Sequence, residues 1–210
     1  IQIMNKPNLF FPTPVWTLQL DKYQSINEQM YKFIKITQSK DHEGISKSNI
    51  KGWHSKDFNM QENEPKNFIK FILPAIEQVI TDMNWEKQKQ SININNMWAI
   101  INTGGSTNLR HQHGNSTISG AYYVRAPINS GDIVFYDPRP APVFCYPEAV
   151  SSNLLNAHIN SITPKEGALI LFPSYVDHSV NENLSNDERI VIIDSTVQFN
   201  NPLLVGEISS

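Results

Sequence analysis

The second half of the chain alternates short apolar runs with turn-forming residues, and this pattern restricts the fold more than any other feature. From about residue 92 the runs INNMWAIIN, STISGAYYV, GDIVFYD, GALILFPS and ERIVIIDSTVQF are separated by Gly, Pro, Asn and Asp. Short apolar segments with this spacing are typical of antiparallel sandwiches and barrels. We therefore expect residues 92–200 to form a β core, and we expect that core to be a jelly roll.

The first 91 residues have a different character and predict supporting helices. Residues 8–20 (NLFFPTPVWTLQL) should be extended, because their two prolines exclude a helix interior. Apolar residues recur at helical spacing over 22–37 and again over 65–84, so each stretch predicts an amphipathic helix. Pro74 should kink the second helix or mark its start. Helices that precede a sheet indicate an α+β, mainly β fold in which the helices buttress the sheet.

Length and composition exclude several classes of protein. A chain of 210 residues fits a single domain, so we expect residues 1–210 to form one, with 1–91 supporting the core at 92–200. No segment approaches the roughly 18 consecutive apolar residues of a membrane span, and the first residues lack the order of a secretory signal. A net charge of −3 without any basic run argues against nucleic-acid binding. The expectation is a cytoplasmic protein with neither membrane nor nucleic-acid partners, whose oligomeric state is open.

Three of the six histidines have the spacing of a metal site. His111 and His113 are separated by one residue, and positions i and i+2 of an extended segment face the same side. His178 follows 65 residues later, where GALILFPSYVD ends. Three imidazoles that converge from two strands leave coordination positions open, as in a catalytic metal site. The alternative for an isolated HxH is a surface pair at a strand end.

Arg189 stands eleven residues beyond His178, at the start of the apolar run IVII. The intervening NENLSND is rich in turn residues and predicts a hairpin that brings His178 and Arg189 close together. A guanidinium that enters the apolar interior needs an anion, and its planar fork suits a carboxylate. The alternative is a solvated arginine that pairs with Asp187 or Glu188.

Six motifs follow one another along the chain: FPTPVW near the start, GWHS at 52–55, HQHGNSTISGAYYV at 111–124, GDIVFYDPR at 131–139, GALILFPSYVDHSV at 167–180 and ERI at 188–190. The order HxH, His, Arg resembles the iron(II)/2-oxoglutarate dioxygenase superfamily. Within it, the chain is most similar to a family of 2-oxoglutarate/iron(II) oxygenases of bacteria and phages. The motifs cover most of the sequence in the right order.

The resemblance implies a double-stranded β-helix that uses iron(II), 2-oxoglutarate as cosubstrate and O2. It places His111 and His178 at the two histidine ligand positions and Arg189 on the distal carboxylate of 2-oxoglutarate. Asn102 falls where related enzymes carry a polar residue that touches the cosubstrate. Tyr122 and Tyr123 are adjacent on a predicted strand, so one of them should face the pocket and hydrogen-bond a cosubstrate carboxylate. We name Tyr123 for this role; the alternative is that the pocket-facing tyrosine only packs against its neighbours. The implied reaction hydroxylates a substrate, which the sequence does not identify, and releases succinate and CO2.

One ligand position departs from the superfamily pattern. His113 stands where an Asp or Glu is usual, which leaves one more unit of positive charge on the metal and its ligands. Asp177 adjoins His178 but would point to the opposite face, and Asp137 is the better substitute carboxylate. We keep His113, so the expected ligand and catalytic set is His111, His113 and His178.

Two other functions fit parts of the pattern. A three-histidine dioxygenase of cupin type would keep all three histidines without needing Arg189 or 2-oxoglutarate. A metal- or ligand-binding β-sandwich without catalytic activity would need no open iron position. The long, proline-punctuated stretch 137–167 is expected to be a lid or binding loop. His54 is expected at an interface beside Trp53, with the pocket mouth as the alternative.

Overall fold

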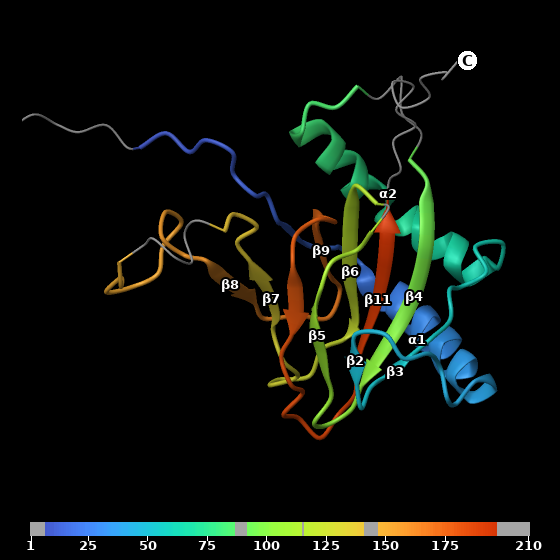
Figure 1. The fold of residues 1–210 in the computed structure, drawn as a ribbon. Coiled ribbons are helices and arrows are strands. Elements are labelled where there is room, and N and C mark those ends of the chain that lie inside the picture. The colour runs from blue at the N-terminus through green and yellow to red at the C-terminus, as the bar shows by residue number, and fades with distance from the viewer. Residues whose placement is uncertain (1–6, 87–91, 115, 141–146, 197–210) are drawn as a thin grey trace, which may run out of the picture.

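The structure, a computed structural model, describes residues 7–86, 92–114, 116–140 and 147–196. Two antiparallel sheets lie face to face (Figure 1). The larger has the order β1-β9-β6-β11-β4-β3 and comprises β1 (Trp16–Gln19), β3 (Trp53–His54), β4 (Ile94–Asn102), β6 (Ile118–Arg125), β9 (Ala168–Pro173) and β11 (Arg189–Thr196). The smaller has the order β2-β5-β10-β7-β8 and comprises β2 (Asn49–Ile50), β5 (Thr107–His111), β7 (Ile133–Tyr136), β8 (Ile159–Ile162) and β10 (His178–Val180). This is the predicted jelly roll, a double-stranded β-helix.

Two helices, α1 (Tyr23–Lys40) and α2 (Asn63–Asp82), cover the outer face of the larger sheet (Figure 1). Strand residues alternate between faces, so Ile190 and Ile192 of β11 pack toward the helices while Val191 faces the smaller sheet. Pro74 lies inside α2 and therefore does not mark its start. Pro65 occupies the first turn of α2, where a missing N–H costs no helical hydrogen bond.

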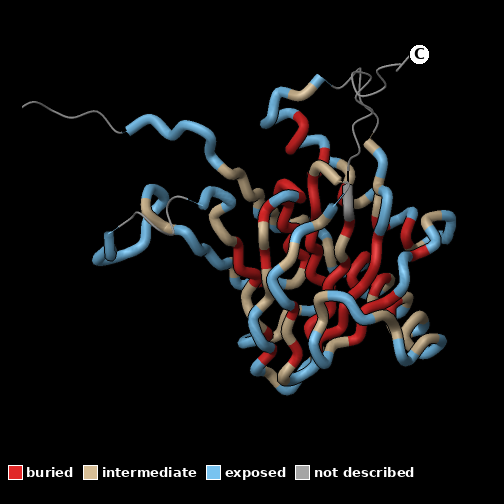
Figure 2. Tube along the Cα trace, viewed as in Figure 1, coloured by how far each residue is buried: buried red, intermediate tan, exposed pale blue. Residues whose placement is uncertain are grey.

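A second apolar cluster fills the space between the sheets. Its buried members come from β6, β7, β9 and β11 and from the turn after β9: Ala121, Tyr123, Ile133, Phe135, Ala168, Ile170, Phe172, Val176 and Val191. Figure 2 shows the buried positions concentrated along these strands and under the helices. The inter-sheet space is therefore packed on one side, and the remainder of it forms the cavity described below.

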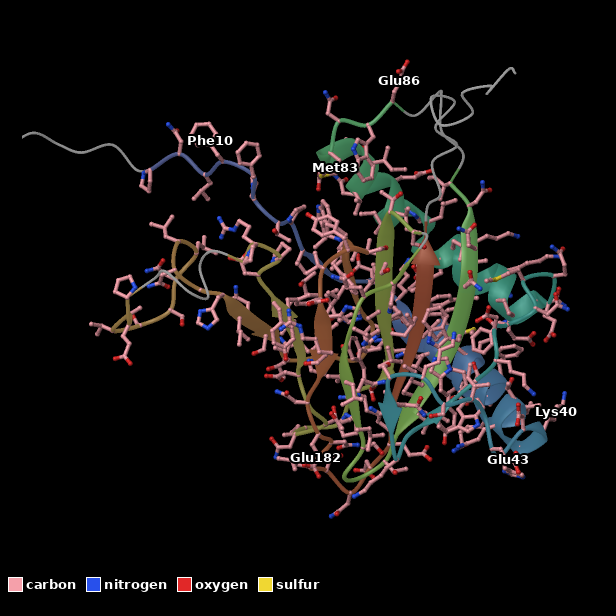
Figure 3. All side chains as sticks on the ribbon, in the orientation of Figure 1. Phe10, Lys40, Glu43, Met83, Glu86 and Glu182 are labelled. Carbon is pink, nitrogen blue, oxygen red and sulfur yellow. The ribbon has the colours of Figure 1, made fainter. Side chains whose placement is uncertain are left out.

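Segments outside the sheets extend away from this core. Residues 8–20 contain no helix and include β1, but a bend at Phe11, whose backbone is left-handed (φ 58°), interrupts the predicted extension. Phe10 projects from the body with 73% of its surface exposed (Figure 3). The stretch 137–167 contains the strand β8 and is not one continuous loop; residues 141–146 of it lie outside the described part. Among the described residues, no helix combines the length and apolar character that crossing a membrane requires.

The predicted hairpin between His178 and Arg189 is wrong. β10 pairs with β5 and β7 in the smaller sheet, whereas β11 pairs with β4 and β6 in the larger one. The turn residues between them carry the chain from one sheet to the other. His178 and Arg189 thus approach the same inter-sheet space from opposite walls. The prediction failed because a turn sequence indicates that the chain reverses but does not determine which sheet the next strand joins.

Candidate metal centre

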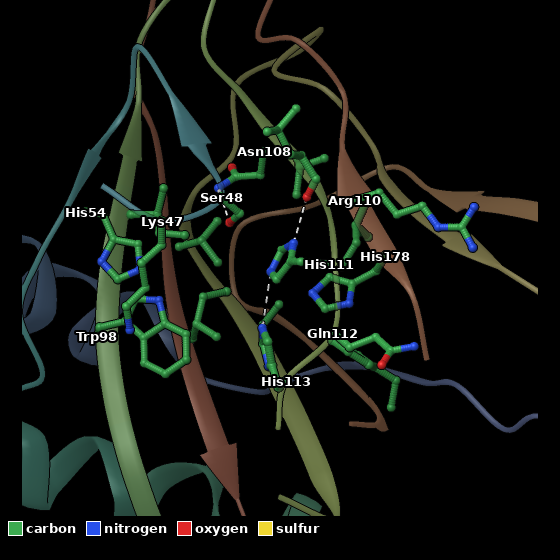
Figure 4. A pocket seen from close by; sticks show the side chains of 18 of the residues that line it. Lys47, Ser48, His54, Trp98, Asn108, Arg110, His111, Gln112, His113 and His178 are labelled. Atoms are coloured by element: carbon green, nitrogen blue, oxygen red, sulfur yellow. Dashed lines mark hydrogen bonds between the residues drawn. The ribbon is translucent and has the colours of Figure 1, made fainter. Parts of the chain in front are cut away.

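The three histidines converge at one end of the inter-sheet space (Figure 4). His111 ends β5 and stands opposite His178, the first residue of β10, with ring centroids 4.3 Å apart. The ring of His113 lies 5.2 Å from that of His111 and 4.9 Å from that of His178. One ring nitrogen from each residue lies within 4.8 Å of the others. Such a set can surround a single ion.

His113 reaches this cluster although it lies beyond the end of β5. Its backbone N–H donates to the carbonyl of Ser174, 3.1 Å away, in the turn after β9. That bond ties the segment to the larger sheet and turns the ring toward His111, so that the two Nε2 atoms are 3.3 Å apart. The i, i+2 argument from strand geometry brought the right residues together, but a loop contact holds the second of them.

Hydrogen bonds at Nδ1 leave Nε2 of His111 and of His178 available. Nδ1 of His111 lies 2.7 Å from the carbonyl of Leu109, and Nδ1 of His178 lies 3.1 Å from the carbonyl of Val176. A carbonyl only accepts, so in both rings Nδ1 carries the proton and Nε2 keeps its lone pair. Orientation of a metal-binding histidine by a partner at its other nitrogen is the usual arrangement in metalloproteins.

His113 is held by hydroxyl groups. Its Nδ1 lies 2.8 Å from Ser119 Oγ, which lies 2.8 Å from Ser174 Oγ, and both serines are fully buried. A hydroxyl can accept from Nδ1–H and pass its own proton to the next oxygen. Because a hydroxyl can equally donate to an unprotonated Nδ1, the chain from His113 to Ser174 is compatible with the tautomer of the other two rings but does not select it.

Burial keeps the imidazoles neutral. Burial, strengthened by the neighbouring histidines, lowers the pKa of His113 to about 3. Burial also lowers the pKa of His178 to about 4, and it lowers the pKa of His111. Near neutral pH all three rings therefore offer lone pairs, which metal binding requires. This donor set fits a divalent transition metal.

No carboxylate joins the cluster within the described residues. Asp177 is bound by the guanidinium of Arg110, whose Nε lies 2.8 Å from its Oδ2. Asp137 is held by Arg139, with 2.7 Å between Nη2 and Oδ2. Neither acid lines the cavity that contains the histidines. Of the carboxylates that the sequence suggested as substitutes for His113, neither lies at the site.

Arg189 is buried in the wall of the same cavity, with 2% of its surface exposed. Its Nη1 donates to the carbonyls of Ser130 and Gly131, at 2.6 and 3.1 Å. In the described part of the chain it forms no ion pair, while Glu188 binds Lys35 at 3.0 Å. The alternative of a solvated Arg189 paired with a neighbouring acid is therefore wrong. A buried guanidinium without an anion is costly, which indicates that an anionic ligand belongs here.

The two tyrosines of β6 face opposite sides of the sheet. Tyr122 points to the helices, where its hydroxyl donates to Asn27 Oδ1 at 2.5 Å. Tyr123 lines the cavity, and its pKa is raised to about 12 because burial outweighs the positive charge of Arg189. Its hydroxyl therefore stays protonated and able to donate. The structure thus identifies Tyr123 as the tyrosine that faces the cavity.

Asn102 lies behind the cavity wall rather than in it. Its side chain is fully buried, and Nδ2 donates to Oδ1 of Asn108 at 3.0 Å. Asn108, on β5, is the residue of this pair that lines the cavity. Asn102 therefore touches the cavity lining only through Asn108, and its contact with a cosubstrate stays a prediction.

The cavity has a volume of about 600 Å³, in the range of small-molecule sites. Its outer part is formed by residues that the sequence did not single out, including Lys47 and Trp98. His54 stacks on Trp98 with 5.6 Å between ring centroids, so it belongs to the cavity wall and not to an interface with Trp53. The available signal was the position of His54 in the motif GWHS.

The neutral histidines predict an acid-sensitive fold for the metal-free protein. In the unfolded chain a histidine titrates near 6.5, so between that value and the lowered pKa the unfolded state binds more protons. Stability is fully present above pH 6.5 and is lost as the pH falls toward 4. From pH 7.5 to 5.5 we expect about 1.4 kcal/mol of lost unfolding free energy for each of His113 and His178.

Urea unfolding of the metal-free protein at the two pH values measures this loss. His178→Asn should remove about half of the combined dependence from the two rings, whereas His42→Asn, at an exposed position outside the site, should not change it. An equal pH dependence in the parent and in His178→Asn would contradict the assignment.

Comparison with known proteins finds a family model that matches part of the chain. The sequence model of a family described as "Putative 2OG-Fe(II) oxygenase" matches residues 96–194. That stretch runs from β4 to β11 and contains the three histidines, Tyr123 and Arg189. No curated protein matches the sequence.

Solved structures show the same fold at low sequence identity. A prolyl-4-hydroxylase from Pseudomonas putida has a TM-score of 0.62 at 10% identity, over 89% of this chain and 93% of that one. A viral collagen prolyl hydroxylase from Paramecium Bursaria Chlorella virus-1, in complex with 2-oxoglutarate, gives 0.56 at 13% identity, over 87% and 94%. HygX from Streptomyces hygroscopicus, with nickel and 2-oxoglutarate bound, gives 0.60 at 8% identity, over 88% and 82%.

Likeness at such identities establishes the fold and nothing more. The family match is more specific, because it covers eight of the strands that build the two sheets and the cavity between them. Residues 96–194 therefore carry the sequence pattern of the 2OG-Fe(II) oxygenases, which are oxidoreductases that use iron(II), 2-oxoglutarate and O2.

Proposed function

We propose that the protein hydroxylates a small substrate, with iron(II) held by His111, His113 and His178 and with 2-oxoglutarate anchored by Arg189 and Tyr123. One observation carries the proposal: a buried guanidinium without an acidic partner lines the same cavity as three neutral imidazoles. The histidines account for a metal, and Arg189 accounts for an anion beside it. Together they match the two requirements of the family.

The donor set suits iron(II) and leaves room for further ligands. Imidazole binds iron readily, and three protein ligands do not fill its coordination positions. Since all three donors are neutral, the metal keeps its full double positive charge. That charge should favour a dianionic cosubstrate more than the usual set with one carboxylate does. The departure at His113 therefore supports 2-oxoglutarate binding.

Arg189 and Tyr123 are suited to the far end of 2-oxoglutarate. A planar guanidinium binds a carboxylate through two parallel hydrogen bonds, and a protonated phenol adds a third donor. The carbonyl of Gly131 helps to fix Arg189 by accepting a hydrogen bond from its Nη1. Glycine is required at this position, because its φ is +91° and a side chain would collide with the backbone of Asn181. A dioxygenase that does not use 2-oxoglutarate would have no need of this anchor, so the anchor favours the 2-oxoglutarate-dependent reaction.

The rest of the cavity supplies a dry environment. Ile133, Phe172, Val180 and Val191 line it together with the histidines and Arg189. These side chains exclude water and hold the cosubstrate against the metal ligands. Bound iron(II) would activate O2, with 2-oxoglutarate supplying two electrons and leaving as succinate and CO2 while the substrate gains a hydroxyl group.

An anaerobic titration tests this function. Protein loaded with iron(II) should develop a visible charge-transfer absorption on addition of 2-oxoglutarate, saturating at one equivalent. Succinate formation after admission of O2 should follow. Stoichiometric iron binding without any response to 2-oxoglutarate would favour the three-histidine dioxygenase that does not use it. Failure to bind iron would favour a protein without oxygenase chemistry.

The hydroxyl chain behind His113 gives a prediction about metal affinity. Ser119→Ala removes the partner of His113 Nδ1 and should weaken metal binding roughly 10- to 100-fold, as loss of an outer-shell partner typically does. Ser119→Thr keeps a hydroxyl and should restore most of the affinity. Competition with a chromophoric chelator measures the change. Equal affinity in Ser119→Ala and the parent would show that His113 is positioned by other contacts.

A further inference from the structure

The outer half of the cavity, where lining side chains are exposed, carries one unpaired charge of each sign. Lys47 and Asp57 both line it, and neither forms an ion pair in the described part of the chain. Lys56, the residue before Asp57, is bound to Asp41 at 2.9 Å, and Arg110 is bound to Asp177. The other cations near the rim are therefore already engaged.

Both charges lie close to one aromatic pair. The ammonium of Lys47 is 5.5 Å from the centroid of Trp98, which stacks on His54. Burial lowers the pKa of His54. The charge of Lys47 lowers it further and that of Asp57 opposes the shift, so the field of each charge reaches that ring. Asp57 accepts a hydrogen bond from Asn96 Nδ2, which fixes its position without neutralising it.

Trp98 connects these charges to the metal centre. Its ring centroid lies 5.7 Å from that of His113 on one side and 5.6 Å from that of His54 on the other. Ile100 and Leu109 add to the apolar wall of the cavity. If Lys47 and Asp57 bind the charged groups of a molecule, an apolar side chain of that molecule would contact Trp98 and extend toward the histidines.

We propose that this outer half is the subsite for a free α-amino acid with an apolar side chain, whose carboxylate binds Lys47 and whose ammonium group binds Asp57. The proposal rests on the proposed function, since it names the substrate class of that reaction. A purely anionic molecule would be repelled at Asp57, and a purely cationic one at Lys47. A residue inside a peptide carries neither charge, and a terminal residue carries one. The cavity of about 600 Å³ must also accommodate 2-oxoglutarate, which limits the substrate to a small molecule.

The reaction then balances with the cosubstrates already named. One C–H bond of the side chain becomes C–OH, with one oxygen atom from O2. The other oxygen atom enters succinate as 2-oxoglutarate loses CO2. No further oxidant or reductant is required.

The first test is a binding screen on protein loaded with iron(II) and 2-oxoglutarate under anaerobic conditions. Each of the twenty common L-amino acids is titrated, with calorimetry and the charge-transfer absorption as readouts. At least one with an apolar side chain should bind, and its N-acetyl and carboxamide derivatives should bind roughly tenfold to a hundredfold more weakly. Absence of binding by all twenty, or equal binding of the derivatives, would overturn the proposal. Tighter binding of the N-acetyl carboxamide would indicate a peptide substrate.

Charge-removing variants give the second test. Lys47→Met should weaken binding of the free amino acid but leave that of its carboxamide unchanged. Asp57→Asn should weaken binding of the free amino acid but leave that of its N-acetyl derivative unchanged. Lys51→Met and Glu43→Gln remove the same charges at exposed positions outside the cavity and should change neither. Losses that do not depend on the derivative would overturn the assignment of the two charges.

Failure of this proposal is distinguishable from failure of the proposed function. If 2-oxoglutarate gives its absorption change and no amino acid binds, the subsite is wrong and the reaction class stands. If 2-oxoglutarate does not bind but calorimetry shows the predicted pattern of amino acids and derivatives, the subsite stands and the reaction class is wrong.

Discussion

Replacing Arg189 by Ala should weaken 2-oxoglutarate binding by roughly 30-fold to several thousand-fold, while iron(II) binding persists. The range corresponds to about 2–5 kcal/mol, the usual effect of truncating one partner of a buried, hydrogen-bonded charge pair. The loss should be large because the guanidinium is almost wholly buried and water cannot replace it. Arg189→Lys should fall between the parent and Arg189→Ala, since it keeps the charge but loses the two-pronged geometry.

Calorimetric titration of each iron-loaded variant with 2-oxoglutarate, with iron content as a second readout, measures the effect. Arg125→Ala is the matched control, because Arg125 pairs with Glu166 outside the cavity. Truncation of Arg189 also leaves the carbonyls of Ser130 and Gly131 without their donor, so unfolding is followed in parallel. Unchanged affinity in a folded, iron-containing Arg189→Ala protein would refute the anchor.

The sequence predicted the long strands because each forms a complete apolar run. INNMWAIIN is β4, and ERIVIIDSTVQF contains β11, the two strands that pair most extensively in the larger sheet. Both are buried on two faces, by the helices and by the smaller sheet, so they lack an alternating polar face and stand out from their surroundings. The same reasoning located the helices 22–37 and 65–84 to within a few residues.

Short strands and the connections between sheets could not be predicted. β2 and β3 contain two residues each and lie in a polar stretch, GISKSNIKGWHS, that has no periodicity to detect. They form because β5 and β4 offer edges to pair with, which is a tertiary effect. For the same reason the contribution of Lys47 to the cavity was missed, and that of His54 was only the alternative expectation.

The candidate site was predictable where spacing alone determines proximity. HxH brings two rings to one region whether the segment is a strand or a loop, and the distant His178 was identified through the order of motifs. The partners of the rings were not predictable, since Ser174 reaches His113 through a turn that joins β9 to β10. The position of Asn102 behind Asn108 was not predictable for a similar reason, because the sequence does not show which side chain covers which.

His113 distinguishes this site from the superfamily pattern, and its charge has a physical consequence. Three imidazoles leave the metal with two positive charges, whereas two imidazoles and a carboxylate leave it with one. Restoring the carboxylate in His113→Asp should strengthen the attraction for iron(II) and weaken that for the dianionic 2-oxoglutarate. The shorter Asp side chain also loses the hydrogen bond to Ser119, which opposes the gain in affinity for iron(II). We therefore expect the gain in iron(II) affinity to be smaller than the loss in 2-oxoglutarate affinity.

Loss of a metal ligand should lower the iron(II) affinity, and by more than His113→Asp raises it. His178→Ala should weaken iron(II) binding by more than about 100-fold, since removal of outer-shell partners alone costs up to that factor. His178 is the most buried of the three rings, so water cannot readily fill the gap with comparable geometry. Anaerobic equilibrium dialysis against iron(II) gives the affinities of the parent, His178→Ala and His113→Asp. His54→Ala serves as the control, because His54 lines the same cavity but lies outside the histidine cluster. Stoichiometric iron in folded His178→Ala would show that the ion is held elsewhere.

Unchanged iron(II) affinity in His113→Asp would mean either that His113 is no ligand or that the site is built for neutral donors. The Ser119→Ala measurement separates those two cases. Only a His113 that binds the metal transmits the loss of its hydroxyl partner to the metal affinity.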